Sequence, residues 1–339
     1  MYTRNRRLAR WIPWSLVGLV LLSLLAGVIV GPVTIPPGNA FASLFGREAE
    51  TVSTVHRVIV RQIRLPRVLL GFLVGSALAV SGVAMQGLFR NSLASPYILG
   101  IASGASSGAA LAILFASGAV FLLPLGAFAG AAAAVLIVYG LARGKDRRTS
   151  IFTLILAGVA VGALFSAVTS FLIYLSSGGE RLSDVLFWIM GGLGRANWLS
   201  IAILLPIVGG GIAVVLTFAR DLNALSLGED GAFHVGVNPV ALTRWLLGAT
   251  TLLTAAAVAM AGTIGFIGLV IPHVMRLLVG PDHRRLIPVS ALAGGCFLVG
   301  SDMVARTVFA PTELPVGVIT AFLGAPFFLY LLRTKGARL

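Results

Sequence analysis

The sequence predicts an all-α membrane protein with about ten transmembrane helices, and three observations lead to this fold class. Of 339 residues, 58% are hydrophobic and only 11% are charged, whereas a soluble domain carries roughly 25% charged residues. The hydrophobic residues form long runs, and about 20 apolar residues span a bilayer as a helix. These runs are too long and too poorly alternating for barrel strands. A soluble protein of two domains, which the length alone would allow, is therefore disfavoured.

Ten apolar segments succeed one another along the chain. We expect the spans at about residues 12–31, 65–89, 97–117, 120–142, 151–175, 199–218, 244–260, 262–271, 286–308 and 315–332. The first span comes after a basic stretch and resembles a signal peptide. It is long, however, and no small-residue cleavage site comes after it, so we interpret it as an uncleaved span. Residues 1–339 are expected to form a single transmembrane domain.

Basic residues between the apolar segments predict the orientation of the chain. The net charge is +14, which in a soluble protein would indicate nucleic acid. With ten spans, however, four basic segments fall on one side: the N-terminus, residues 143–148, residues 282–285 and the C-terminal tail. Positive charge in short loops marks the cytoplasmic side. We therefore expect both termini in the cytoplasm and membrane lipid, not nucleic acid, around the chain.

One basic cluster lies on the side that should face outward. It precedes the second span and consists of Arg57, Arg61, Arg64 and Arg67. If this segment is helical, spacings of three and four place the first three on one face. The cluster either anchors the helix at the lipid interface or forms a docking surface for an acidic partner. Asp302 and Arg306, four residues apart near the outer end of the ninth span, are expected to form an ion pair.

Two patterns of small residues concern the internal architecture. Residues 67–71 and 244–248 share the pattern Arg-x-Leu-Leu-Gly, and each opens a small-residue-rich span. The two spans run in opposite directions, which predicts two inverted five-helix halves, a common build of transporters. Residues 100–108 carry a small residue at every fourth position. That spacing indicates either tight helix packing or a small-residue lining for a wide pathway.

The chain lacks the residues that several chemical functions need. The chain has no phosphate-binding loop, so it should not hydrolyse ATP itself. Its single cysteine, Cys296, lies inside an apolar segment, and no metal-ligand spacing is present. An ion-coupled carrier, the main alternative to an ATP-driven importer, would need ionisable residues near the midplane. A membrane enzyme acting on lipids would need a polar catalytic cluster. A transporter that has neither a phosphate-binding loop nor ionisable residues near the midplane most simply takes its energy from a separate ATPase subunit.

Four stretches of the sequence resemble the FecCD family of ATP-binding-cassette importers. These are permeases for iron–siderophore complexes, haem and vitamin B12. The matching stretches are residues 64–67 with 85–96, residues 225–238, residues 262–284 and residues 313–328. The string Gly-Phe-Ile-Gly-Leu-Val-Ile-Pro-His within residues 265–273 is the most specific of them. Ser92 departs from the pattern, because the family often has proline there.

The resemblance implies the type II importer permease fold and a homodimer around a central pathway in the bacterial inner membrane. It also implies two ATPase subunits, which bind the ATP, and a periplasmic or lipid-anchored substrate-binding protein. No cofactor or metal is expected in this chain. The implied substrate is a bulky metal chelate, with a ferric siderophore or haem favoured over cobalamin.

The resemblance also implies roles for individual residues. The cytoplasmic loop at residues 220–243 would couple the ATPase to the spans, and it is expected to hold two short helices near 224–228 and 232–236. Its coupling residues are Leu225, Leu227, Gly228, Glu229, Ala232 and Gly236. The residues that would dock the binding protein are Arg64, Arg67 and Arg306, and the candidate inner gate is Asn91 with Leu93.

Overall fold

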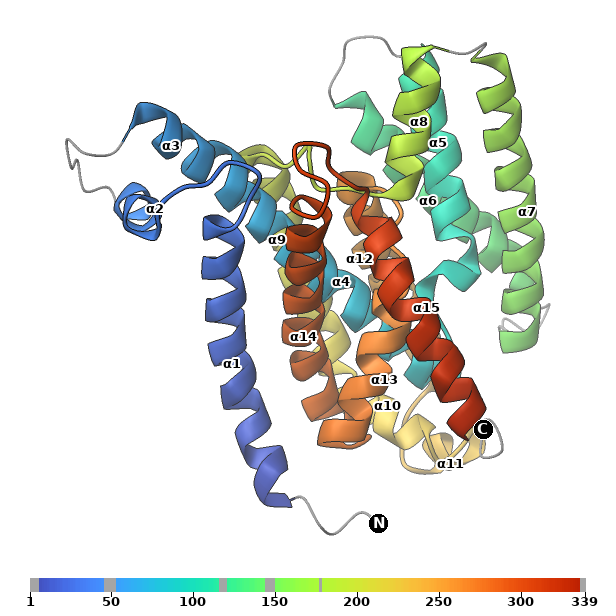
Figure 1. The fold of residues 1–339 in the computed structure, drawn as a ribbon. Helices are drawn as coiled ribbons and strands as arrows, with labels where there is room; N and C mark the ends of the chain where they lie inside the picture. Colours follow the sequence, from blue (N-terminus) through green and yellow to red (C-terminus); the bar gives the residue numbers. More distant parts are fainter. Residues whose placement is uncertain (1–5, 46–52, 116–120, 144–149, 177–178, 336–339) are drawn as a thin grey trace.

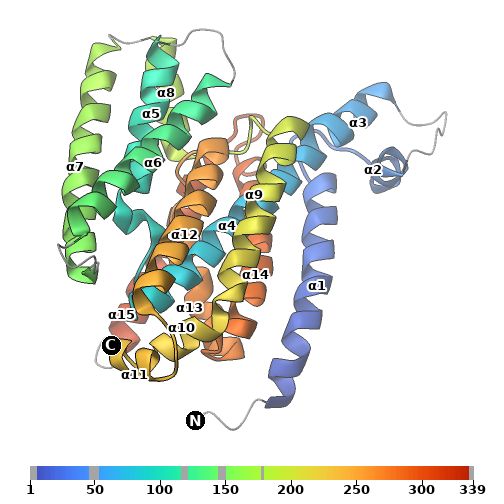
Figure 2. The ribbon, with the colours of Figure 1, turned by 180° about the vertical axis from the view of Figure 1, so that it is seen from behind.

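The computed structural model describes residues 6–45, 53–115, 121–143, 150–176 and 179–335, and its regular elements are all helices (Figure 1). Seen from behind in Figure 2, the same helices form one bundle with α1 at its edge. The helices are α1 (Arg6–Ile29), α2 (Pro37–Leu44), α3 (Thr54–Val58), α4 (Leu65–Leu88), α5 (Ile101–Phe115), α6 (Leu122–Ala142), α7 (Ile151–Leu175), α8 (Glu180–Met190), α9 (Trp198–Thr217), α10 (Ala219–Leu225), α11 (Glu229–His234), α12 (Pro239–Ala261), α13 (Ile267–Val279), α14 (His283–Ala305) and α15 (Val316–Lys335). A π-helix, η1 (Ile59–Arg64), joins α3 to α4, and a 3₁₀ helix, η2 (Pro96–Leu99), precedes α5.

The ten expected spans correspond to helices of the structure. In the described residues, six helices are long and apolar enough to cross a membrane, and four shorter apolar helices accompany them. The eighth span was misplaced, because α13 covers Ile267–Val279 and residues 262–266 are not helical. Gly262 and Phe266 both have positive φ there, at 69° and 67°, so the chain turns before α13 starts. The sequence also missed α8, which is too short for a span.

Helix α4 lies at the centre of the bundle and organises the packing around it. It contacts α14, α12, α13 and α9, and most of its side chains are buried. Its closest neighbour is α14, because both helices carry glycine where they cross. A Cβ atom at Gly75 would come within 2.2 Å of the Gly294 carbonyl oxygen. A side chain at either position would therefore push the two helices apart.

The small residues of the segment 100–108 serve helix packing. A Cβ atom at Gly104 would lie 2.4 Å from the Gly130 carbonyl oxygen of α6. One at Gly108 would lie 1.9 Å from the Gly126 carbonyl oxygen. Helices α5 and α6 thus approach closely along this face. This is the tight helix packing that was one of the two interpretations of the sequence pattern, the other being a pathway lining.

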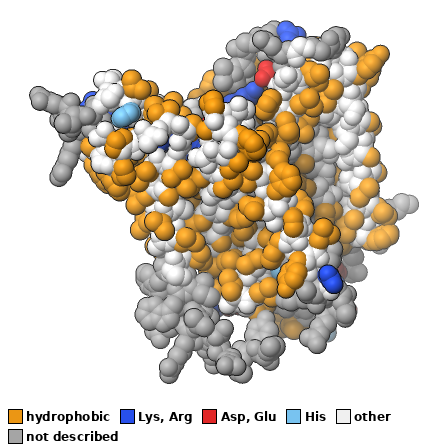
Figure 3. All heavy atoms as spheres, in the orientation of Figure 1, with side chains coloured by type: hydrophobic (Ala, Val, Ile, Leu, Met, Phe, Trp, Pro, Cys, Tyr) orange, Lys and Arg blue, Asp and Glu red, His pale blue; other side chains and the backbone are white. Residues whose placement is uncertain are grey.

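The two ends of the bundle differ in what they carry. We name these ends inner and outer after the orientation that the sequence predicts. At the inner end lie the start of α1, α10 and α11, the turn between α13 and α14 and the end of α15 (Figure 1). At the outer end lie α2, α3, the C-terminal end of α1 and the loop between α14 and α15. Of the basic segments that predicted orientation, residues 1–5, 144–149 and 336–339 lie outside the described residues. Between the ends, hydrophobic side chains spread over the visible face (Figure 3), as expected for a surface in contact with lipid.

Candidate coupling and docking sites

The inner end presents the predicted coupling loop as two short helices, α10 and α11. Both begin a few residues earlier than expected, at Ala219 and Glu229. Leu225 and Ala232 are buried and hold the two helices against the bundle. Leu227, between the helices, is 69% exposed. The sequence did not single out Phe233 or Val235, yet both are as exposed as Leu227.

Glycine and acidic residues shape this loop. Gly228 and Gly236 have φ values of 98° and 87°, which favour glycine, and they flank α11. Glu229 and Asp230 form the first turn of α11 and are exposed. The inner end therefore offers an apolar patch, defined as Leu227, Phe233 and Val235, beside two carboxylates.

The candidate inner gate comes directly after the C-terminal end of α4. Arg90 has a φ of 49°, so the chain turns sharply there. Asn91 is exposed, and its side-chain oxygen accepts a hydrogen bond from the Leu93 backbone N–H at 2.8 Å. The segment 90–95 is thus a structured turn at the inner end, and its role in gating stays a prediction.

The outer end holds a network of four charged side chains, which we call the outer network: the buried Arg67, Asp302 and Arg306, and the partly exposed Glu313. Arg67 Nη2 lies 2.8 Å from Asp302 Oδ1, and Arg67 Nη1 lies 2.8 Å from Glu313 Oε2. The predicted pair of Arg306 and Asp302 is present at 3.5 Å. Because Arg67 binds both carboxylates with its planar fork, it is the centre of the network. Two positive and two negative groups balance one another there.

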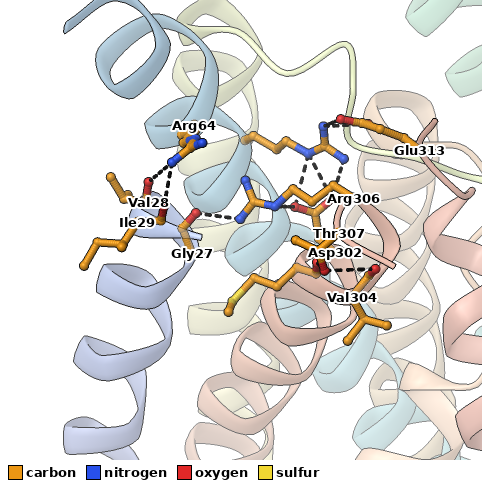
Figure 4. Close-up of polar contacts among 11 residues, drawn as sticks. Gly27, Val28, Ile29, Arg64, Asp302, Val304, Arg306, Thr307 and Glu313 are labelled. Atoms are coloured by element: carbon orange, nitrogen blue, oxygen red, sulfur yellow. Dashed lines mark hydrogen bonds and ion pairs between the residues drawn. The ribbon is translucent and has the colours of Figure 1, made fainter. Parts of the chain in front are cut away.

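Arginines also satisfy the carbonyl groups at the C-terminal end of α1 (Figure 4). The last four carbonyls of a helix have no partner within it. In α1, Ala26 O accepts from Val30 N–H, and Gly27 O accepts from Arg306 Nη2 at 2.5 Å. Arg64 Nη1 donates to Val28 O at 3.1 Å and to Ile29 O at 2.6 Å. Positive charge is also favourable at this end of the helix dipole.

The three arginines predicted to dock a binding protein, Arg64, Arg67 and Arg306, are buried in this chain, and their docking role stays a prediction. Their residues are only 2%, 6% and 2% exposed. Arg61 and Arg64 lie on the π-helix η1 and bind other partners than Arg67 does. Arg61 donates to Ser43 O and Arg64 to α1, whereas Arg67 turns to α14. The departure from the positive-inside trend therefore has an internal reason, the carboxylates and carbonyls that these arginines bind.

A cavity opens beside the outer network. It has a volume of about 710 Å³ and lies between α6, α8, α9 and α12. Apolar side chains such as Trp188, Ile203 and Met260 line most of it, while Arg67 and Glu313 reach its wall. A cavity of this size and character falls in the range of small-molecule sites, but Arg67 and Glu313 on its wall are already paired with each other.

Comparison with known proteins identifies this arrangement. The model of the FecCD transport family matches residues 19–334, nearly the whole chain. The chain belongs to the FecCD transport family. A solved metal-chelate type ABC transporter in an inward-facing conformation has the same fold, with a TM-score of 0.83 and 32% identity. That match covers 94% of this chain and 98% of the other.

Relatives within the family are named as importer permeases for two metal chelates. The chain is 50% identical over 282 residues to the cobalamin import system permease of Halobacterium salinarum, covering 83% of this chain and 75% of the relative. It is 42% identical to the vitamin B12 import system permease of Klebsiella pneumoniae, and that match covers 99% of this chain and 97% of the relative. It is 44% identical to the hemin transport system permease of Yersinia pestis, covering 80% and 81%. This FecCD permease is therefore an ABC importer subunit of the inner membrane.

Proposed function

We propose that this FecCD permease forms a homodimer that imports a bulky metal chelate, driven by two separate ATPase subunits. The observation that carries the proposal is the apolar patch at the inner end. Leu227, Phe233 and Val235 are between 61% and 69% exposed, beside the exposed carboxylates of Glu229 and Asp230. Lipid does not explain this patch, because the inner end also carries charged and polar groups. A protein partner would cover this patch. Because the chain itself has no phosphate-binding loop, we expect that partner to be the ATPase subunit.

The proposed orientation places the inner end in the cytoplasm. The start of α1, the coupling helices and the end of α15 all lie at that end, in agreement with the positive charge of the loops. A substrate-binding protein would then dock at the outer end. There, Arg64, Arg67 and Arg306 would set the shape of the docking surface from within, because their side chains are already bound inside the chain.

Cobalamin is the first candidate substrate and haem is the second. Relatives from Halobacterium and Klebsiella are named for cobalamin or vitamin B12, and a relative from Yersinia is named for hemin. These relatives shift the order that the sequence favoured, in which ferric siderophore and haem preceded cobalamin. All of these ligands are bulky metal chelates.

Transport by the reconstituted complex tests this proposal. The permease, its cognate ATPase subunit and its cognate binding protein would be assembled in proteoliposomes and supplied with labelled cobalamin, haem or a ferric siderophore. We expect ATP-dependent accumulation of cobalamin and no ATP hydrolysis by the permease alone. Uptake of haem instead of cobalamin would identify haem as the substrate. An assembled complex that transports none of the chelates would contradict the proposal.

A further inference from the structure

Three polar side chains join the coupling helix α10 to the start of α14. Asn223 lies on α10, Asp282 immediately precedes α14, and His283 is the first residue of α14. Asn223 Nδ2 donates to Asp282 Oδ1 at 2.7 Å, and Asn223 Oδ1 accepts from the His283 backbone N–H at 2.9 Å. Asn223 Oδ1 also lies 2.7 Å from His283 Nδ1, which donates when that nitrogen is protonated. A single amide therefore binds α14 through both its oxygen and its nitrogen.

Helix α4 packs directly against this cluster. A Cβ atom at Gly87 of α4 would lie 2.8 Å from His283 Nε2 and 2.9 Å from Leu222 Cδ2 of α10. His283 is 7% exposed, and its Nε2 has no hydrogen-bond partner among the described residues. The inner ends of α4, α10 and α14 thus meet at one point, and Gly87 leaves the room for it.

Asp282 keeps the charge that this arrangement needs. Burial alone would raise the pKa of Asp282. The hydrogen bond from Asn223, the Arg284 backbone N–H and the charges of Arg284 and Arg285 outweigh that effect and lower the pKa below its usual value. The side chain therefore stays an ionised acceptor at neutral pH, while its Oδ1 also caps α14 through the Arg284 N–H at 3.0 Å.

No other side chain of α10 or α11 hydrogen-bonds to another helix in the described part of the chain. The remaining attachment of α10 is apolar, through residues such as Leu222 and Leu225. Apolar contacts are not directional and allow sliding, whereas hydrogen bonds weaken steeply when their angles change. The Asn223 contacts are thus the directional part of the attachment.

We propose that Asn223, Asp282 and His283 form the joint through which movement of the coupling helices reaches α14 and α4. This inference rests on the proposed function. The joint would turn α10 and the start of α14 as one body, and α4 would move with them because it packs against both. The segment 90–95, with the candidate gate residues, directly continues α4, so the joint would connect the ATPase to that gate. The three residues act as positioning residues and need not touch the substrate.

Exchanging the two partners provides a selective test. Asn223→Asp places a carboxylate against Asp282 and removes the donor, while adding Asp282→Asn returns an amide to the pair and can still cap α14. We expect Asn223→Asp to raise the ATP hydrolysed per transported substrate about tenfold, as expected for losing a hydrogen bond and gaining a like-charge contact. The double variant should return most of the way to the wild-type ratio. Arg220→Gln, a change at an exposed position of α10 outside these contacts, is the matched control and should leave the ratio unchanged.

Asn223→Ala covers the case in which Asn223→Asp does not assemble, because it removes the contacts without adding a charge. It should raise the same ratio about fivefold. An unchanged ratio in assembled Asn223→Ala complexes would overturn the joint. The joint would also be overturned if the double variant hydrolysed as much ATP per transported substrate as assembled Asn223→Asp does.

A distance measurement separates the joint from the proposed function. Spin labels at the exposed positions 220 and 285 on a Cys296→Ala background would report the distance between α10 and α14 with and without ATP. We expect a constant distance in the otherwise unchanged complex and an ATP-dependent change with Asn223→Ala. A distance that changes equally in both would overturn the joint. If no chelate is transported, the proposed substrate fails, and these distances still decide the inference.

Discussion

Helix α14 is attached to its neighbours in different ways at its outer and inner ends. At the outer end, Arg67 and Asp302 form a buried ion pair, with side chains 8% and 2% exposed. At the inner end, one neutral amide, Asn223, connects α10 to α14 and is only partly buried. Breaking a buried ion pair leaves an unpaired charge and costs several kcal/mol, whereas a single hydrogen bond contributes about 1 kcal/mol. The outer end is therefore suited to hold the fold, and the inner end is suited to move.

The largest effect is expected at the outer end. Asp302→Ala removes the carboxylate that Arg67 and Arg306 share, and it leaves Glu313 as the only carboxylate in the outer network. We expect a loss of about 3–5 kcal/mol in the free energy of unfolding, measured by denaturation in detergent. Asp184→Ala is the control, because Asp184 pairs with Arg195 at 3.8 Å in an exposed position and should cost less than about 1 kcal/mol. Equal stability of the two variants would end the distinction between the two ends.

A second change at the outer end concerns α1. Arg64→Met removes the donors to the Val28 and Ile29 carbonyls while keeping the apolar stem. Leaving a buried carbonyl without a partner costs about 1–3 kcal/mol. We expect faster hydrogen exchange in the last turn of α1, with α4 unchanged. Arg57→Met, at a half-buried position of the same segment, should leave α1 as protected as in the wild type, and α1 protection that survives Arg64→Met would refute the capping role.

At the inner end, a change on the apolar patch should affect assembly and leave the fold intact. Leu227→Asp places a charge at a position that is 69% exposed in the chain, so the free energy of unfolding should not change. Burying a leucine side chain contributes about 1.5–3 kcal/mol, and the variant should therefore bind the ATPase subunit at least about tenfold more weakly. Co-purification and titration with the ATPase subunit would measure this. Undiminished binding would remove Leu227 from the interface.

The smallest effect is a pH dependence at the inner end. The pKa of Asp282 is lowered in the folded chain, so its contribution to stability is present above the unfolded-state pKa of about 3.9. That contribution is lost as the pH falls through the lower folded-state pKa. The stability difference between wild type and Asp282→Asn should thus be constant from pH 5 to pH 8. A difference that varies within that range would show that another group controls the contact.

The sequence predicted most of the features that solvent and chain geometry dictate. The ten spans come from apolar runs, because lipid requires each segment to satisfy its own backbone as a helix. The two short coupling helices come from glycines such as Gly228 and Gly236, whose positive φ separates helical turns. Helix α8 and residues 262–266 were missed or misplaced, because a short helix and an unwound segment carry no signal of length or period.

The sequence by itself therefore determined the membrane fold, the pair of short helices α10 and α11, and the arginines that precede α4. Only the tertiary structure decided where those arginines point. Arg64 binds Ile29 of α1, which lies 35 positions away along the chain, and Arg67 binds Asp302, which lies 235 positions away. In the same way, Asn223 meets His283 across 60 positions. Local spacing places a side chain on a helix face, but its partner depends on how distant helices pack, and in a membrane each buried charge must find that partner inside the protein.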